Sequence, residues 1–184
     1  MAVDRLAASS TSCMPGQLPA NAMKLITVLT PCYNEEENVE LLYKAVKSVF
    51  AELPAYSYEH LFIDNASTDR TSVILRRIAN TDTNVKVILN ARNFGPVRSS
   101  FHGFLEARGD AVIGVVADFQ DPPELIPQLI AKWEEGYKAV MTVKDASEEN
   151  WLMYGLRKRY YSLLARISNV RIIQNAAGRL PALI

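Results

Sequence analysis

The sequence predicts an α/β fold, a three-layer α/β/α arrangement around a mostly parallel central sheet. Short apolar runs rich in β-branched residues recur along the chain, and each is followed by a longer segment with apolar residues at helical spacing. Alternating strands and helices are joined by right-handed crossovers, which place the strands side by side with helices on both faces. A length of 184 residues suits one such domain with a sizeable core.

Five strands are expected from the apolar runs, because turn-forming or polar residues follow each run. The predicted strands are 25–30, which Pro31 ends, 58–63, 85–89, 111–117 and 138–143. The run at 111–117 is the most apolar, so this strand is expected near the centre of the sheet.

The helices between the strands begin at recognisable residues. Asn34 lies three residues before Glu37, and the pair is expected to cap the first helix. A proline is tolerated in the first turn of a helix, where its fixed φ is suitable. Further helices are expected to begin at 67–69, 95–96, 122–123 and 148.

Composition excludes several classes of protein. Apolar residues make up 49% of the chain, but no run reaches the roughly 18 residues of a transmembrane helix. The 20 basic and 20 acidic residues cancel, so no global field steers the chain to nucleic acid. The 2 cysteines, Cys13 and Cys32, form no disulfide framework, and we expect them to be reduced in a cytoplasmic protein. Residues 1–22 are expected to form a flexible leader before a domain over 23–184.

Polar clusters directly follow the predicted strands, at 31–35, 64–69, 90–95, 118–121 and Lys144. The carboxyl ends of parallel strands meet at one edge of the sheet, and ligands bind beyond that edge. The sequence therefore predicts a binding site assembled from five loops. No Walker A or G-x-G-x-x-G pattern is present, which removes the commonest phosphate-loop and dinucleotide sites. A nucleotidyltransferase would need a glycine-rich, basic loop after its first strand, and this chain has neither feature there.

The cluster at 116–123 offers oxygen ligands for a divalent cation. Asp118 and Gln120 stand two residues apart, so in an extended segment both point to the same side. Carboxylate and amide oxygens suit Mg²⁺ or Mn²⁺, and such a cation neutralises a diphosphate. The alternative for Asp118 is a structural turn, and Asp121 is expected to cap the helix that begins at Pro122.

The other clusters allow both a binding and a structural role. Tyr33 and Glu35, beside a helix start, can pack on and hydrogen-bond a nucleoside. Asp64 can accept from a base or a ribose hydroxyl, or it can cap its own turn through the backbone amides that follow it. Arg92 supplies a cation in a loop that can approach phosphate, or it lies in a surface turn.

Four segments, in this order, resemble the family 2 glycosyltransferases. They are TPCYNEEEN (30–38), DNASTDRT (64–71), RNFG (92–95) and ADFQDPPE (117–124). Each is a weak signal alone, but the order and spacing together are specific. The likeness covers residues 25 to about 175 and is greatest to the branch that moves a hexose onto a polyisoprenyl phosphate. That branch includes dolichyl-phosphate mannose synthases and bacterial undecaprenyl-phosphate glucosyltransferases.

The resemblance implies a GT-A fold, a nucleotide-sugar donor and dependence on Mg²⁺ or Mn²⁺. It also implies roles for the residues after the first two strands. Pro31, Tyr33 and Glu35 correspond to the lining of the nucleoside pocket. Asp64 corresponds to a residue that contacts the base, with Asn65 beside it.

The resemblance further implies a metal and phosphate site. Asp118 and Gln120 correspond to metal ligands on the diphosphate, and Asp118 is the expected catalytic residue. Lys144 falls where such enzymes often carry a basic residue near the phosphates, and Arg92 is expected to bind the nucleotide. Val116 departs from the family, which often has an aspartate here, so one carboxylate near the metal is missing.

The implied reaction is an inverting transfer of a hexose from a donor of the UDP-glucose or GDP-mannose type to a lipid phosphate. Relatives continue into an acceptor-side motif, interfacial helices and often membrane spans, whereas AAGRLPALI at the end of this chain matches none of these. A chain truncated before its acceptor side is therefore expected. The alternatives are a soluble family 2 transferase with a sugar acceptor and a non-catalytic nucleotide-sugar-binding remnant. The helix predicted over 148–168 mixes basic and aromatic residues, so it can lie on the cytoplasmic face of a membrane or be solvated.

Overall fold

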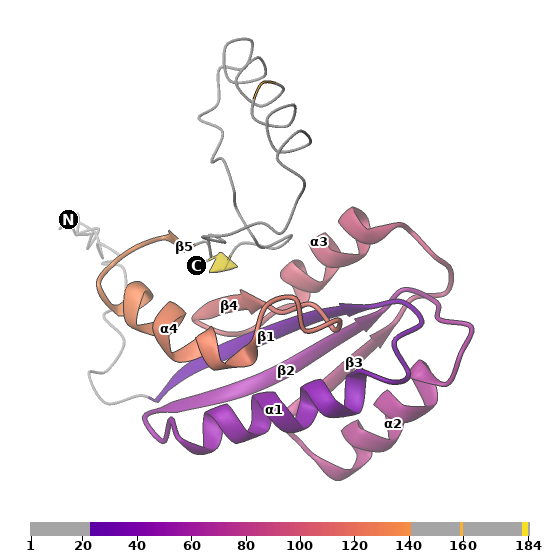
Figure 1. The fold of residues 1–184 in the computed structure, drawn as a ribbon, viewed down its shortest axis with the longest axis horizontal. Coiled ribbons are helices and arrows are strands. Elements are labelled where there is room, and N and C mark those ends of the chain that lie inside the picture. Colours follow the sequence, from indigo (N-terminus) through magenta and orange to yellow (C-terminus); the bar gives the residue numbers. More distant parts are fainter. Residues whose placement is uncertain (1–22, 141–158, 160–181, 184) are drawn as a thin grey trace, which may run out of the picture.

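Parallel strands form the centre of the fold (Figure 1). The computed structural model describes residues 23–140, 159 and 182–183. The parallel strands are β1 (Lys24–Cys32), β2 (Tyr56–Asp64), β3 (Val85–Leu89) and β4 (Ala111–Gly114). The sheet has the order β3-β2-β1-β4-β6-β5, in which β6 (Ala182–Leu183) is antiparallel to both β4 and β5 (Ala139–Val140). The mostly parallel sheet is confirmed, and β4 lies near its centre as predicted.

β1 and β2 form where the sequence has continuous apolar runs, which is typical of strands covered on both faces. The prediction that Pro31 ends the first strand is wrong. Pro31 lies within β1, opposite Ile63 of β2. The carbonyl of Leu29 accepts the amide of Val115, so Leu29 and, two residues on, Pro31 turn their backbone groups toward β4. β4 has already ended at Gly114, and the missing amide of Pro31 therefore costs no ladder hydrogen bond.

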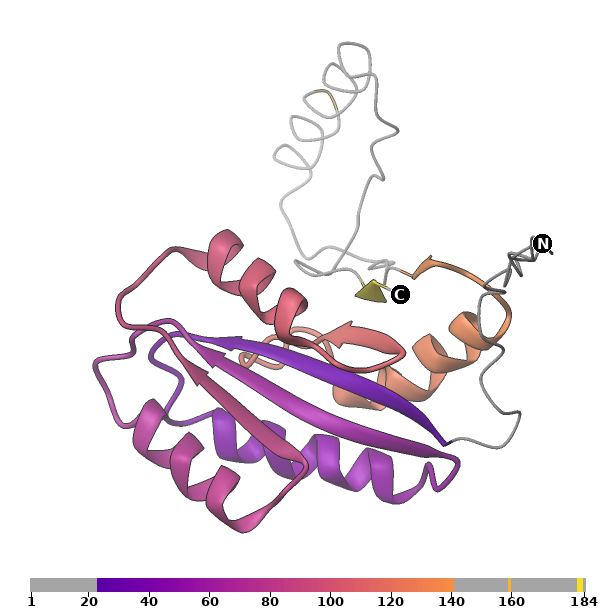
Figure 2. The same cartoon turned by 180° about the vertical axis from the view of Figure 1, so that it is seen from behind.

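Helices cover both faces of the sheet, which confirms the three layers (Figures 1 and 2). The helices are α1 (Val39–Ala51), α2 (Thr71–Thr81), α3 (Pro96–Glu106), η1 (Pro123–Leu125) and α4 (Ile126–Glu134). Buried residues of α1, α2 and α4 join one core cluster with β1 and β2. Phe104 of α3 packs instead on Leu29, Leu61 and Ile63, whose side chains form a second cluster on the opposite face.

The first two helices begin later than their capping patterns predicted. α1 starts at Val39 with Asn38 at the cap position, and α2 starts at Thr71. Asn34 is left-handed, with φ 56°, and its Oδ1 accepts the amide of Thr68 at 2.8 Å. The predicted capping role of Asn34 is therefore wrong, because its side chain bonds the loop after β2.

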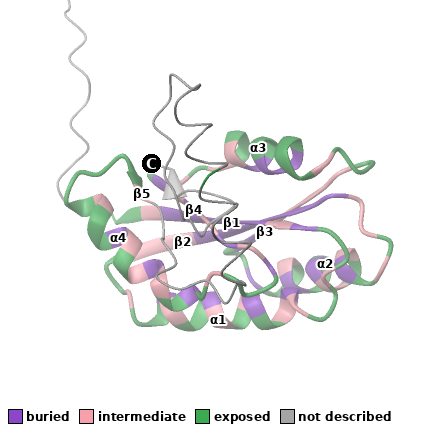
Figure 3. Cartoon of the chain, turned by 45° about the horizontal axis from the view of Figure 1, so that its top comes forward, coloured by how far each residue is buried: buried purple, intermediate pink, exposed green. Residues whose placement is uncertain are grey.

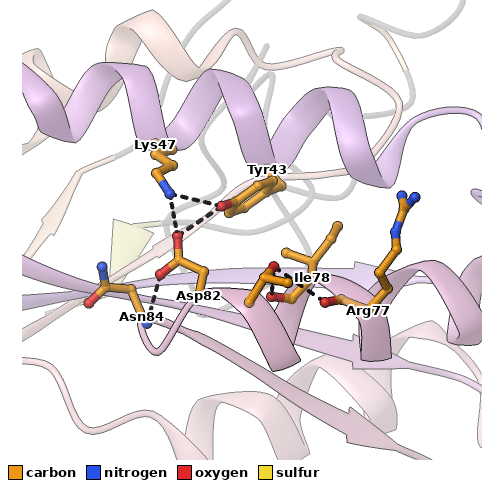
Figure 4. Close-up of polar contacts among 7 residues, drawn as sticks. Tyr43, Lys47, Arg77, Ile78, Asp82 and Asn84 are labelled. Carbon is orange, nitrogen blue, oxygen red and sulfur yellow. Dashed lines mark hydrogen bonds and ion pairs between the residues drawn. The ribbon is translucent and has the colours of Figure 1, made fainter.

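Charged side chains join the helices to the amino-terminal edge of the sheet. Asp82, before β3, is 8% exposed and accepts from Lys47 at 2.7 Å and Tyr43 at 2.8 Å, both on α1 (Figure 4). Asp82 also accepts the amide of Asn84 at 3.0 Å. Burial alone would raise the pKa of Asp82, but the hydrogen bonds from Lys47 and Tyr43 hold it below its usual value.

Glu59 of β2 makes a second such network. It is 3% exposed and accepts the hydroxyl of Thr27 at 2.7 Å, the amide of Arg108 at 2.8 Å and the ammonium of Lys86. These partners come from β1, the α3–β4 loop and β3. The Glu59 carboxylate therefore joins three neighbouring strands, β1, β2 and β3, to the loop that precedes β4.

Some predicted features lie outside the described residues. These are the leader 1–22, Cys13, Lys144, the fifth strand beyond Val140 and most of the last helix. Arg159 is described, and it is helical and exposed. Among the helices that the structure describes, none combines the length and the apolar character needed to cross a bilayer.

Candidate functional site

A cavity of about 830 Å³ lies at the carboxyl ends of the parallel strands. Its walls come from the loops after β1 and β2, the loop before α3, α3 itself and the segment after β4. A volume of this size suits a nucleotide or a similarly large ligand. The predicted edge of the sheet is thus the one that carries the cavity.

The structure brings five predicted site residues together in the lining of this cavity. They are Pro31, Tyr33, Glu35, Asn65 and Asp118. Sequence reasoning missed most of the α3 wall, which is apolar and includes Val97, Phe101 and Phe104. The only sequence signal for this wall was the Gly-Pro that begins α3.

Three other predicted residues are described but do not line the cavity. Asp64 is 2% exposed, and it accepts both the amide and the hydroxyl of Ser67, so it caps its own turn. The guanidinium of Arg92 lies over the ring of Phe94, 4.8 Å from its centroid. Gln120 is exposed.

The loops after β1 and β2 are joined by reciprocal hydrogen bonds. Asn34 accepts the amide of Thr68 at 2.8 Å. The amide of Glu36 donates to Asp69 at 3.1 Å, and the carboxylate of Glu36 accepts the amide of Arg70 at 3.0 Å. Much of the polar character of the first two motifs is therefore used to hold the two loops together.

Tyr33 and Glu35 remain directed at the cavity between these contacts. Tyr33 is 48% exposed, which leaves its ring available to a ligand. One carboxylate oxygen of Glu35 accepts the side-chain amide of Asn38 at 2.8 Å, which orients the carboxylate. The pair therefore offers a stacking surface and a hydrogen-bond acceptor on the same wall.

Asn65 positions the loop that precedes α3. Its Oδ1 accepts the side-chain amide of Asn90 at 3.2 Å and the backbone amide of Phe94 at 2.9 Å, and its Nδ2 donates to Asn93 at 2.9 Å. Asn90 also donates to Ser99 of α3 at 3.0 Å. Asn65 is 5% exposed, so these contacts replace most of its hydration. The asparagines between 90 and 93 were missed as individual site residues, although the cluster was noted.

Backbone strain is concentrated at the same edge. In the described part of the chain, the non-glycine residues with positive φ are Asn34 (56°), Ala66 (62°) and Phe119 (57°). They follow the ends of β1, β2 and β4 respectively. Left-handed backbone costs a residue with a Cβ about 1–2 kcal/mol, and such strain clusters at functional sites. Its placement supports a functional role for this edge.

The segment around Asp118 is a turn rather than the extended segment expected. Phe119 is left-handed, and Oδ1 of Asp118 accepts the amide of Gln120 at 3.2 Å. The expectation that Asp118 and Gln120 point to one side of an extended strand is therefore wrong. The capping role predicted for Asp121 is also wrong, because η1 has no side-chain cap.

The fit of a divalent cation depends on the donor set at Asp118. Within the residues described, no three His, Cys, Asp or Glu side chains converge. Oδ2 of Asp118 has no hydrogen-bond partner in the same part of the chain. Mg²⁺ is commonly bound by one or two carboxylates together with substrate phosphates and water. The donor set therefore fits a cation that arrives with a diphosphate.

Cys32 also borders the cavity but is 2% exposed. Burial raises the pKa of its thiol well above the usual value, and the nearby carboxylates of Asp64 and Glu35 raise it further. The thiol is therefore protonated near neutral pH and is a poor metal ligand.

The sequence pattern of the family described as "Glycosyl transferase family 2" matches residues 27–182. The chain belongs to this family. The match begins within β1, and it includes β2, β3, β4 and the whole lining of the cavity described above.

Individual members of glycosyl transferase family 2 are similar to the chain over most of its length. A prophage bactoprenol glucosyl transferase homolog of Escherichia coli K12 is 38% identical over 151 residues, which are 82% of this chain and 49% of the relative. A bactoprenol glucosyl transferase of Shigella phage SfV matches with the same identity and coverage. The chain thus spans about half the length of these curated relatives.

A solved member of the same fold supports the GT-A architecture. The structure of Staphylococcus aureus TarS 1-349 in complex with UDP matches with a TM-score of 0.51 and 24% identity. The match covers 68% of this chain and 37% of TarS 1-349. This likeness concerns the fold alone.

Proposed function

We propose that this chain is the donor-binding part of a glycosyltransferase that moves a hexose from a nucleotide-diphosphate sugar to a polyisoprenyl phosphate. The observation that carries the proposal is the cavity at the carboxyl edge, with Tyr33 and Glu35 on one wall and Asp118 on another. The names of the E. coli and phage relatives support glucose as the sugar and bactoprenol as the lipid. The reaction would take place at the cytoplasmic face of a membrane.

In the proposed reaction, an oxygen of the lipid phosphate attacks the anomeric carbon of the sugar. The bond from that carbon to the diphosphate breaks, and its electron pair leaves with the nucleoside diphosphate. A phosphate is already anionic near neutral pH, so a strong general base is not required. Catalysis then depends on positioning and on stabilisation of the leaving group.

Each wall of the cavity has a separate task in this scheme. Tyr33 stacks on the nucleoside, and Glu35 accepts from it. Asn65 holds the 90–95 loop and so acts as a positioning residue. Asp118, with Gln120 as a further candidate, would hold Mg²⁺ or Mn²⁺ on the diphosphate, and Lys144 is a candidate to bind the phosphates directly. When bound, the cation supplies positive charge that stabilises the leaving group.

Calorimetry with UDP, GDP and dTDP, each with and without Mn²⁺, tests the donor site. We expect one nucleotide to bind the parent chain with a dependence on Mn²⁺, and we expect Asp118→Asn to weaken that binding about 10- to 100-fold. Asp121→Asn is the matched control, since Asp121 is a half-buried carboxylate three residues from Asp118 that does not line the cavity. Unchanged Mn²⁺-dependent binding in Asp118→Asn would show that Asp118 does not hold the metal.

A second candidate function is binding of a nucleotide sugar without transfer. Val116 favours this candidate, because it lines the cavity beside Asp118 at a position where the family often has an aspartate. An assay that measures donor hydrolysis and transfer to undecaprenyl phosphate separately distinguishes the two. Transfer supports the enzyme, whereas nucleotide binding with neither activity supports the binding protein.

A further inference from the structure

Helix α3 turns three large apolar side chains away from the core, whereas Phe104 packs on it. Val97, Phe101 and Leu105, spaced four residues apart on one face, are 80%, 62% and 69% exposed. We call these three residues the α3 stripe. Ordinary amphipathic helices bury such a stripe, because its transfer out of water is a main source of stability. The outer side of α3 in Figure 3 accordingly shows exposed residues over the sheet.

The fully buried residues of α3 are small, and they let the helix approach the sheet closely beside Phe104. Ser99, Ser100 and Gly103 face the sheet. A Cβ added to Gly103 would lie 2.5 Å from Cδ1 of Leu29, so the helix packs too closely to accept a larger residue at this position without a shift of Leu29.

The α3 stripe is continuous with the cavity. Val97 and Phe101 belong both to the exposed stripe and to the cavity lining that contains Asp118. An apolar path thus leads from the proposed diphosphate position to the outer surface of the helix. The other exposed large apolar residues of α1 and α2, Leu41 and Val73, stand singly on their helices and do not line this cavity.

The surroundings of the α3 stripe are basic. Between residues 92 and 108, the three arginines Arg92, Arg98 and Arg108 are exposed. The only acidic residue in this range is Glu106, whose Oε1 lies 3.8 Å from Nε2 of His102. The chain as a whole has equal numbers of basic and acidic residues, so this excess is local. Apolar side chains flanked by arginines are the combination that binds the surface of an anionic bilayer.

We propose that the α3 stripe docks on an anionic lipid bilayer and delivers the lipid phosphate to the cavity from that side. The proposal rests on the proposed function, since a polyisoprenyl phosphate has an apolar chain that remains in the bilayer while its phosphate reacts. Docking through α3 places the apolar wall of Val97 and Phe101 between the bilayer and Asp118. The isoprenoid chain then follows the same apolar surface as the membrane itself.

Co-sedimentation of the 184-residue chain with vesicles tests the docking surface. The probes are phosphatidylcholine vesicles with and without about a quarter of phosphatidylglycerol. We expect binding to the anionic vesicles, about tenfold weaker binding for Leu105→Glu, and a larger loss for the double variant Phe101→Glu with Leu105→Glu. Leu41→Glu on α1 is the matched control, because Leu41 is 57% exposed and the substitution is identical.

Several outcomes would overturn the docking proposal. One is a parent chain that does not bind anionic vesicles, and another is Leu105→Glu binding them as well as Leu41→Glu does. A drop in thermal stability or a change in oligomeric state with Leu105→Glu would show that the chain itself or a second copy covers the stripe. A UDP and GDP titration separates this proposal from the proposed function, because Leu105 does not line the cavity. Vesicle binding without nucleotide binding would contradict the proposed donor-binding function but support α3 as a membrane-docking surface.

Discussion

The two edges of the sheet are held together by different chemistry. At the amino-terminal edge, carboxylates pair with lysines from neighbouring elements: the buried Asp82 with Lys47, the buried Glu59 with Lys86 and the exposed Glu134 with Lys24. At the carboxyl-terminal edge, asparagines such as Asn34 and Asn65 and carboxylates such as Asp69 bond backbone amides of the loops, and the backbone is strained.

The charged groups at the two edges of the sheet therefore have different roles, structural at one edge and available for binding at the other. The carboxylates at the amino-terminal edge are already paired with lysines of the same chain, so they are not available to bind a ligand. Among the described residues, Asp118 and the arginines at 92 and 98 take part in no ion pair. A site for an anionic donor and a cation needs charged side chains that are not already paired. The hydrogen bonds that join the loops to one another do not involve these three side chains' charges.

The largest expected effect is on stability at the amino-terminal edge. Glu59→Ala leaves the Thr27 hydroxyl, the Arg108 amide and the Lys86 ammonium without their shared acceptor. We expect the free energy of unfolding to fall by about 3 kcal/mol, measured by urea denaturation, with nucleotide affinity unchanged in the folded protein. Glu40→Gln, which removes surface ion pairs to Lys44 and Arg77, should cost less than about 1 kcal/mol.

At the carboxyl-terminal edge, one substitution is expected to lower both the stability and the nucleotide affinity. Asn65→Ala removes the hydrogen bonds to Asn90, Asn93 and the amide of Phe94. We expect a loss of about 2 kcal/mol in unfolding free energy and, unlike Glu59→Ala, nucleotide binding about tenfold weaker, because the cavity wall loosens. Asn80→Ala, at an exposed position of α2, is the control and should change neither measurement appreciably. Equal nucleotide affinity in the two variants would contradict the positioning role.

Between the two edges, a buried histidine makes stability depend on pH. His60 is fully buried against Phe62 and shares a hydrogen bond of 3.0 Å with Thr30, and burial lowers its pKa to about 3. The unfolded chain protonates this imidazole below about pH 6.5 and the folded chain does not, so stability falls as pH drops from 6.5 toward 3. We expect about 2 kcal/mol less stability at pH 5 than at pH 7 by chemical denaturation. His60→Leu should remove most of this dependence, whereas the exposed His102→Gln should retain it.

The smallest expected effect tests the strained backbone. Ala66 has φ 62°, a conformation that glycine adopts without steric cost. We expect Ala66→Gly to raise the unfolding free energy by about 0.5 kcal/mol, because relief of strain exceeds the added entropy of the unfolded chain. Ala107→Gly is the control, because Ala107 has φ −64° and should lose stability by about 0.5–1 kcal/mol. A loss at both positions would show that the strain at 66 is small.

The sequence alone predicted the layers, the four parallel strands and the edge that carries the cavity. β3 occurs at its predicted residues, and the cluster after each parallel strand lies at one edge. These features follow from local periodicity, because apolar spacing and turn residues act over a few positions along the chain. The family was also evident from the sequence, since its motifs are contiguous segments.

Tertiary structure decided which polar residues face the ligand and which hold the loops. Asn34 was predicted to cap the helix of its own segment, but it bonds Thr68, 34 residues away, and Asp69 bonds Glu36 across 33 residues. Local spacing also did not reveal that α3 turns its apolar side outward, since that depends on how closely Gly103 approaches Leu29 of β1. Interactions between distant residues arise only when the strands are paired in register. For this reason the edge of the site was predictable, whereas the roles of its individual residues were not.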